Sequence, residues 1–337
     1  MYKLFMRIKM AAVVAVVATC AAFSQTGKNG LFSGVTAKPY LMSYTHMRTG
    51  VTGVHRRDTL FFKQEKVIFG VNVKLNEYWS AQVGVDLINM RTPYLKPAMI
   101  NYAKNRWKVD IGIFYLSHLE ESLIRFWNNR FIWQVAADKW MHDPTADLGV
   151  RATYRWNDYL TTDVSIFSGT GYQHLTDEFH PMPTFRFILS PVKMLKLGGY
   201  ASVQKNENIT RHSFSGFVHL QPDNTWKLTG EYHYKNNYNY AQGRQLYVQD
   251  MRLHVASVYA TYNFTSWWSM VGRYDVIRSE INGKSGNRPE DGQAWLTGWI
   301  FRCTPSLRLS VDYCNKRPSL ASIGKEDWLY VCMEFKY

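Results

Sequence analysis

The strongest constraint on this chain is a strict alternation of apolar and polar residues that recurs in short segments along most of its length. From Leu329 to Tyr337, every second residue is apolar or aromatic, and the opposite face includes Glu334 and Lys336. Because successive side chains of a strand point to opposite faces, each such segment predicts a β-strand with one apolar side. That side can pack on a soluble core or lie against lipid, with polar groups in a lumen.

The first residues predict export. Three basic residues precede a short apolar run, Met10 to Ala18, and small residues follow up to Ser24. This layout predicts a signal peptide over residues 1–24, export through the Sec pathway, and a mature domain over residues 25–337. The apolar run is shorter than the roughly 20 residues that a membrane-spanning helix needs, and no longer run occurs elsewhere.

Sixteen alternating segments follow, the first near Leu31 to Arg48 and the last at Trp328 to Tyr337. Clean segments have about 9–11 residues, the length of a tilted membrane-spanning strand. Tight turns, such as Asn76 to Tyr78, alternate with longer gaps, such as the outer loop around Arg57. Prolines are expected between the strands, with Pro97 in a loop, because proline cannot donate to a ladder hydrogen bond.

These features predict the fold class, an all-β transmembrane antiparallel β-barrel of about 16 strands with an inward-folded long third loop. Open sheet edges are excluded in lipid, so the sheet must close, and about 16 strands leave an aqueous lumen. The 22 Tyr, 18 Phe and 12 Trp residues suit the two aromatic girdles of such a barrel.

The charged residues are expected to face the lumen, because a charge facing lipid at the midplane costs roughly 2–4 kcal/mol. The formal net charge of +14 predicts a positive lumen and small anionic solutes, and mutual pairing of both signs is the alternative. The spread of bases around strands argues against nucleic acid as a partner. The predicted pore-lining basic residues are Lys74, Lys108, Arg151, Arg155, Arg186, Lys196, Lys227, Arg273, Arg308 and Lys336.

The longest interruption of the alternation runs from Leu116 to about Ala146 and mixes charged with aromatic residues. As the third outer loop, it is expected to fold into the lumen and narrow it, and a loop folded over the rim is the alternative. The predicted constriction residues are Glu120, Glu121, Arg125 and Arg130.

Short motifs around this loop are Gly112-Ile113-Phe114, Glu120-Glu121, Phe126-Trp127, Arg130-Phe131-Ile132, Asp138, Asp147-Leu148-Gly149-Val150 and Ser168-Gly169-Thr170-Gly171-Tyr172. Over roughly residues 98–175 the chain resembles the phosphate-selective porin O and P family, in its Bacteroidales-type membership. The resemblance implies a sixteen-stranded channel for anions or other small solutes, and a homotrimer. Phosphate as the solute is left open.

The resulting prediction is a porin, a passive channel for small hydrophilic solutes with a preference for anions, in the outer membrane of a Gram-negative bacterium. It would contact outer-membrane lipid and lipopolysaccharide, and no catalysis, cofactor or metal is expected. Two alternatives stay open: a plugged structural or secretion-associated barrel that binds protein partners, and a sugar-conducting channel. The sugar path would use four lumen-side rings, Phe114, Phe167, Tyr200 and Tyr330.

Three weaker patterns are judged against simpler explanations. Ser117, His118 and Glu121 could suggest a nucleophile with its base, but a hydrogen bond at the rim is favoured. The His174, Asp177, Glu178 and His180 group could suggest a metal site, but loop solvation is favoured. Cys303, Cys314 and Cys332 are expected to be free, and a bridge between the last two stays open.

Overall fold

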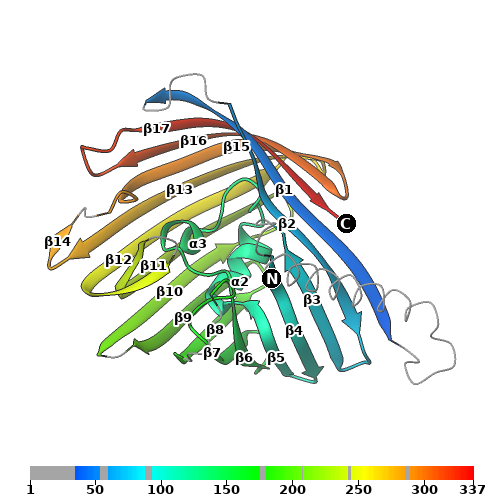
Figure 1. Cartoon of the computed structure of the whole chain (residues 1–337). Coiled ribbons are helices and arrows are strands. Elements are labelled where there is room, and N and C mark those ends of the chain that lie inside the picture. Colours follow the sequence, from blue (N-terminus) through cyan, green and yellow to red (C-terminus); the bar gives the residue numbers. More distant parts are fainter. Residues whose placement is uncertain are drawn as a thin grey trace, which may run out of the picture.

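The computed structural model describes residues 35–53, 60–87, 93–174, 180–206, 208–241, 244–285 and 288–337. Within these ranges, sixteen long strands and one two-residue strand form a single closed antiparallel sheet (Figure 1). The sixteen-stranded barrel predicted from the sequence is confirmed. The signal peptide, the residues around Arg57, and Asp177 and Glu178 lie outside the described residues, so those predictions stay predictions.

The strands follow the predicted order along the chain. They are β1 (Thr36–Gly53), β2 (Leu60–Lys74), β3 (Trp79–Asp86), β4 (Tyr94–Lys104), β5 (Trp107–Tyr115), β6 (Ala146–Arg155), β7 (Leu160–Phe167), β8 (Met182–Val192), β9 (Leu195–Asn206), β10 (Ile209–Leu220), β11 (Trp226–Ala241), β12 (Arg244–Asn263), β13 (Trp268–Ile281), β14 (Lys284–Ser285), β15 (Gly292–Thr304), β16 (Leu307–Pro318) and β17 (Glu326–Lys336). Three short helical elements lie between β5 and β6: α2 (Ser117–Glu121), the π-helix η1 (Ser122–Phe126) and α3 (Ala136–Trp140).

Closure of the sheet occurs at β1, which pairs with β2 on one side and with β17 on the other. Met42 of β1 lies opposite Ile68 of β2 and opposite Lys336 of β17. Each of the sixteen long strands described therefore pairs with another strand on both sides, as a sheet surrounded by lipid requires. In the described part of the chain, no helix is long and apolar enough to cross a membrane.

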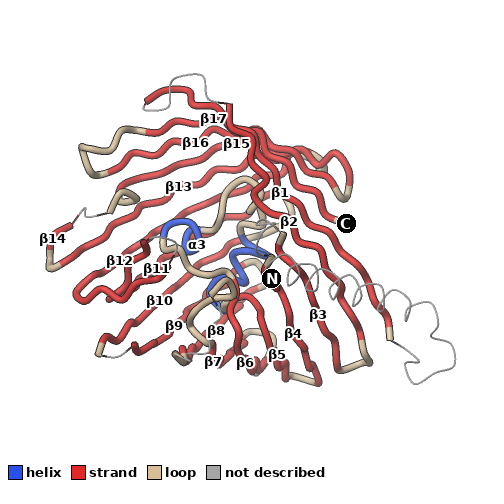
Figure 2. The backbone as a smooth tube through the Cα atoms, viewed as in Figure 1, coloured by secondary structure: helices blue, strands red, loops and turns tan. Residues whose placement is uncertain are grey.

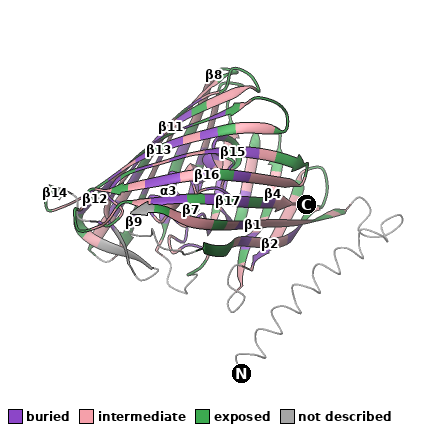
Figure 3. Cartoon of the chain, turned by 90° about the horizontal axis from the view of Figure 1, so that it is seen from above, coloured by how far each residue is buried: buried purple, intermediate pink, exposed green. Residues whose placement is uncertain are grey.

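Burial alternates with the period of two that the sequence predicts in strands such as β7, β13 and β17, and Figure 3 shows buried and exposed positions along the strands. In β7, Asp163 and Ser165 are buried on the inner face, whereas Val164 and Ile166 are 56% and 54% exposed on the outer face. A polar inner face and an apolar outer face are the arrangement of a barrel in lipid rather than of a soluble sheet on a core.

The two ends of the barrel differ. At the short-turn end, tight turns join β2 to β3, β6 to β7, and further pairs, and the C-terminus lies at the same end. Asn76 and Asn157 fix two of these turns, because each side-chain oxygen accepts backbone N–H groups two and three residues later, all at 2.8 Å. The opposite end, the long-loop end, carries the longer connections.

Some local expectations were wrong. Pro39, Pro97, Pro183 and Pro191 lie inside strands, not between them. Their positions explain how the ladders tolerate them: Pro97 and Pro191 lie at register shifts of β3–β4 and β8–β9, and Pro39 and Pro183 lie near strand starts. The Asn- and Tyr-rich stretch 236–243, expected as a loop, mostly extends the β11–β12 hairpin.

Candidate functional site

The 116–145 segment, between β5 and β6, is attached to the inner wall by a cluster of charges. Arg151 of β6 donates to Asp110 at 2.6 and 2.9 Å and to Glu120 of α2 at 2.7 and 3.3 Å. Arg186 of β8 donates to Asp163 at 2.5 Å and to Glu120 at 3.4 Å. Two wall arginines and two wall carboxylates thus surround one carboxylate of the segment. Figure 2 shows the short helices of the segment within the outline of the strands.

The charge of Glu120 is stabilised by this cluster. Burial opposes ionisation, but Arg151 and Arg186 outweigh it and lower the pKa of the Glu120 carboxyl below its usual value. Asp110 and Arg151 are both fully or almost fully buried, so the cluster is shielded from solvent. Its charges neutralise one another and hold the segment, rather than offering free positive charge to a solute.

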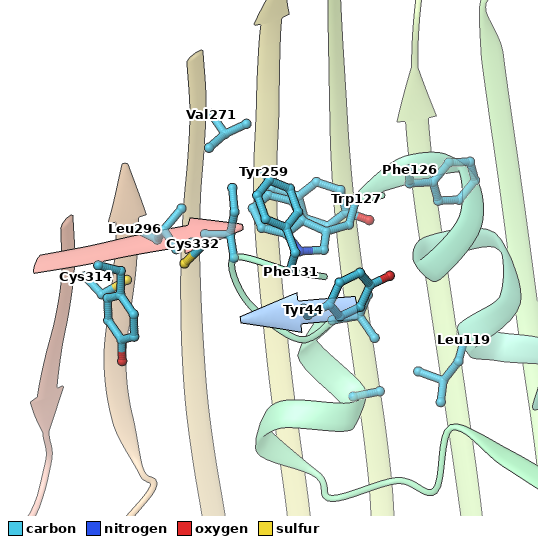
Figure 4. Packing of buried hydrophobic residues seen from close by; sticks show 14 of the residues in the cluster. Tyr44, Leu119, Phe126, Trp127, Phe131, Tyr259, Val271, Leu296, Cys314 and Cys332 are labelled. Atoms are coloured by element: carbon cyan, nitrogen blue, oxygen red, sulfur yellow. The ribbon is translucent and has the colours of Figure 1, made fainter. Parts of the chain in front are cut away.

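Apolar contacts continue the attachment along β10, β11 and β12. Phe126 stacks on His219 with ring centroids 4.2 Å apart, and Trp127 packs edge-on against Tyr259 at 5.3 Å. Ser122 donates a hydrogen bond to Glu231 of β11. Figure 4 shows the rings of Phe126, Trp127 and Tyr259 among the side chains of this buried cluster.

The second half of the segment is bound near the long-loop end. The indole N–H of Trp140, on α3, donates to Asp275 of β13 at 2.5 Å. His118 contacts Asp143 through Nε2 at 2.9 Å. Burial, aided by the neighbouring His233 and Lys235, lowers the pKa of His118 well below its usual value, so the ring is neutral near pH 7.

Three cavities lie beside the segment: one at the long-loop end against β1 to β3, one at the short-turn end against β11 to β16, and a smaller one against β1, β2 and β17. The long-loop cavity has a volume of about 510 Å³, and the short-turn cavity about 540 Å³. Between them lies the narrow passage, of about 170 Å³, which shares Tyr44, Lys66 and Arg130 with the first cavity and Asn128 with the second. Shared lining residues therefore place the narrow passage between a cavity at the long-loop end and a cavity at the short-turn end.

The charges that line these cavities are unevenly distributed. The charged residues that line the narrow passage are Lys66, Arg130 and Lys336. Those of the short-turn cavity are Arg125, Lys227, Arg302 and Arg308. Among the described residues, no Asp or Glu lines either of these two spaces. The long-loop cavity is mixed, with the acidic side chains of Glu65, Asp86, Asp138, Asp143 and Glu290.

Each cation of the narrow passage has a carboxylate partner that lies outside the passage. Arg130 pairs with Asp138 at 2.7 Å, and Lys66 lies 4.0 Å from Asp86. Lys336 pairs with Glu334 at 2.6 Å, and its side chain is 43% exposed. Burial opposes the charge of Arg130, but Asp138 outweighs it and raises the pKa of the guanidinium. Of these partners, Asp86 and Asp138 line the adjoining long-loop cavity, and Glu334 lines none of the three cavities.

The predicted pore-lining residues fall into three groups. Arg151, Arg186 and Arg273 are buried and ion-paired, and Arg273 also donates to the backbone carbonyl of Gln134. Lys227, Arg308 and Lys336 line the short-turn cavity or the narrow passage. The remaining four lie at or near the short-turn end and line none of the three cavities: Lys74, Lys108, Arg155 and Lys196.

The four predicted constriction residues also separate. Arg130 lines the narrow passage and Arg125, whose side chain is 60% exposed, lines the short-turn cavity. Glu120 belongs to the buried cluster, and Glu121 is 3.4 Å from Arg125.

Lys66, Arg302 and Tyr44 also line these cavities, although they were not among the residues predicted from the sequence. Lys66 is two residues ahead of Ile68 on the inner face of β2, and its alternation with Ile68 was the available signal.

The nucleophile-and-base pattern does not assemble. Ser117 donates to Asp163 at 2.9 Å whereas His118 contacts Asp143, so they do not form a nucleophile and base. Among described residues, no group of three or more His, Cys, Asp or Glu side chains could hold a metal ion. The four lumen-side rings are buried, and none lines the three cavities. All three described cysteines are free: Cys303, Cys314 and Cys332.

The Asp147 and Ser168-Gly169 motifs meet in space. Asp147 accepts hydrogen bonds from the Ser168 hydroxyl at 2.5 Å and from the Gly169 N–H at 2.7 Å. Gly169 has a φ of +80°, a conformation that favours glycine. The motifs therefore fix the connection after β7 to the start of β6, beside the segment.

Comparisons with known proteins agree with the fold. Neither a protein-family model nor a curated protein sequence matches the chain. The outer membrane channel DcaP of Acinetobacter baumannii is similar in structure, with a TM-score of 0.67 and 12% identity over 92% of this chain and 99% of that one. An anion-selective porin from Comamonas acidovorans gives 0.65 and 7%, over 90% and 100%.

A third similar structure is the trimer form of OmpT, an outer membrane protein of Vibrio cholerae, with a TM-score of 0.65 and 10% identity over 90% of this chain and 99% of that one. At these identities the likeness shows the fold alone. The chain therefore has the fold of the outer-membrane porins. The resemblance to the phosphate-selective porin O and P family stays a prediction.

Proposed function

We propose that the protein is a porin of the Gram-negative outer membrane, a passive diffusion channel that prefers small anions. The observation that carries this proposal is the distribution of charge along the cavities: seven cationic side chains and, among described residues, no carboxylate line the narrow passage and the short-turn cavity. Basic side chains around a pore favour anions. The 116–145 segment narrows the channel by filling the side of the lumen next to β6–β13.

The experiment is the zero-current potential of the purified protein in planar bilayers under a gradient of potassium chloride. The proposal predicts a potential of the sign set by chloride. In the double variant Lys66→Gln with Lys336→Gln, the potential should move toward zero, because two of the three cations of the narrow passage are lost. The double variant Lys74→Gln with Arg155→Gln removes equal charge at the short-turn end and should keep the original value. A potential of potassium sign in the unaltered protein would refute the proposal.

Two further aspects belong to this proposal. The chain performs no catalysis and needs no cofactor, and it contacts lipid and lipopolysaccharide through its apolar outer face. A homotrimer is implied by the family resemblance and supported by the trimeric form of one similar structure. Cross-linking in detergent tests the trimer. The alternative of a plugged barrel predicts no conductance at all, so the same bilayer recording separates it from the channel.

A further inference from the structure

One wall of the narrow passage is apolar. Leu123 and Ile124 of η1 and Met42 of β1 line it. Ile124 is 49% exposed, although its neighbours Ser122 and Phe126 on the same π-helix are buried against the inner wall. The same turn of the helix that buries Ser122 and Phe126 thus directs Leu123 and Ile124 into the narrow passage. About half of the Ile124 surface is uncovered there.

The remaining part of the lining combines charge with two aromatic side chains, Tyr44 and Tyr115, and with Asn128. Lys66, Arg130 and Lys336 contribute the cations, and the buried Tyr44 lies on β1, between the strands that carry Lys66 and Lys336. The Tyr44 hydroxyl donates to the sulfur of Met42 at 2.8 Å, which holds the apolar and polar parts of the wall together. A solute in this space would have three cations within reach of an anionic group and apolar side chains beside the rest of its body.

An apolar wall discriminates between kinds of anion. Chloride and phosphate carry no apolar surface, so contact with Ile124 or Leu123 gives them no favourable free energy and removes water from them. A carboxylate with an alkyl body can keep its charge beside the lysines while its methylenes leave water. Sites for small organic molecules commonly combine apolar walls with a few placed charges in this way.

We propose that the narrow passage is a binding site for small organic carboxylates with an apolar body, which it binds more tightly than inorganic anions. The proposal rests on the proposed function, because it requires a conducting passage that prefers anions. It concerns the solute class that this passage selects, a property that positive charge alone does not determine.

The expected size of the effect follows from methylene burial. Complete burial of one methylene strengthens binding roughly fourfold, and a wall that touches one side of the solute should give about half of that free energy, or roughly twofold. The test uses potassium acetate, butyrate and hexanoate at pH 7 as blockers of the chloride current in planar bilayers. Over the four added methylenes, the half-blocking concentration should fall roughly 16-fold.

Three variants test whether the dependence of block on carboxylate chain length arises in the narrow passage. Ile124→Ser should flatten the dependence on chain length, whereas Ile124→Leu, which retains an apolar side chain, should preserve it. Leu75→Ser changes a residue with a similar exposed fraction, 40%, at the short-turn end, outside the passage, and should also preserve it. Comparison of the three variants also excludes an effect of carboxylates on the lipid. Such an effect would persist in all three, whereas the site predicts its loss in Ile124→Ser alone.

The outcomes separate the two proposals. A flat chain-length dependence in a channel whose zero-current potential has chloride sign overturns the carboxylate site and leaves the anion channel in place. A chain-length dependence that survives Ile124→Ser, or that Leu75→Ser abolishes, also overturns the site. A zero-current potential of potassium sign refutes the anion channel itself, and the carboxylate site with it.

Discussion

The attachment of the 116–145 segment through Arg151 gives a sharp prediction for the variant Arg151→Met. The guanidinium side chain is 3% exposed and makes two hydrogen bonds to Asp110 and two to Glu120. Without it, Asp110 keeps Lys108 at 3.1 Å, whereas Arg186 at 3.4 Å is the one ion-pair partner that Glu120 keeps among the described residues. Removing one partner of a buried ion pair costs about 3–5 kcal/mol in total.

Part of that cost falls on the barrel wall and part on the docking of the segment. Hydrogen bonds to charged groups contribute about 1.5–3 kcal/mol, so docking through Glu120 should weaken by about that amount. The population of channels with an undocked segment should then rise roughly 10- to 100-fold. Single-channel recordings measure this as more frequent and longer visits to a level of higher conductance, since the segment no longer fills its side of the lumen.

The control lies on the same strand. Arg155 pairs with Asp158 at the short-turn end with a side chain that is 61% exposed, so Arg155→Met should change stability by less than about 0.5 kcal/mol. Glu120→Gln should resemble Arg151→Met, and the double variant should add little, because both changes remove the same contact. If Arg151→Met shows no more high-conductance visits than Arg155→Met, the segment is not held by this cluster.

Three further results are expected. Because the His118 pKa is lowered in the docked segment, docking carries no protonation penalty above about pH 6.5 and weakens below it by up to about 1.4 kcal/mol per pH unit. High-conductance visits should therefore increase as the pH falls from 7 to 5, and His118→Gln should reduce this dependence; an unchanged frequency would contradict it. Trp140→Phe removes the indole N–H bond to β13 and should lower the stability of the barrel by about 1–3 kcal/mol, seen as heat-modified mobility on gels at a lower temperature than for the unaltered protein. A maleimide should label the exposed Cys303 in the folded barrel, and labelling of Cys314 or Cys332 before unfolding would show that the inner faces of their strands are misassigned.

The strands could be predicted because lipid imposes one rule on all of them. Outer positions must be apolar, so the faces of β5 and β7 are visible in the sequence, and β5 has the predicted bounds, Trp107–Tyr115. Where a strand extends beyond the apolar band, the alternation of its sequence does not show where the strand ends. Lys63 to Lys66 lies before the first clear apolar alternation of β2, so the strand was expected to begin at Val67 although it begins at Leu60.

The candidate site was predictable only in part, because alternation gives the face of a residue and not its partner. Arg151 and Lys336 both belong to the inner face of their strands. Arg151 meets Asp110 across β5–β6 and Glu120 from the 116–145 segment, whereas Lys336 meets Glu334 and stays 43% exposed. The difference depends on which wall the segment packs against, and contacts between residues far apart in the chain decide that.

Accessibility of the narrow passage tests the account most directly. In the variant Ile124→Cys, made in a Cys303→Ser background, the new thiol should lie in the path of the current. A negatively charged thiol reagent should react faster than a positively charged one of similar size and should reduce the single-channel conductance. If modification leaves the conductance unchanged, or if the positively charged reagent reacts faster, the current does not follow a cation-lined route beside β1, β2 and β17.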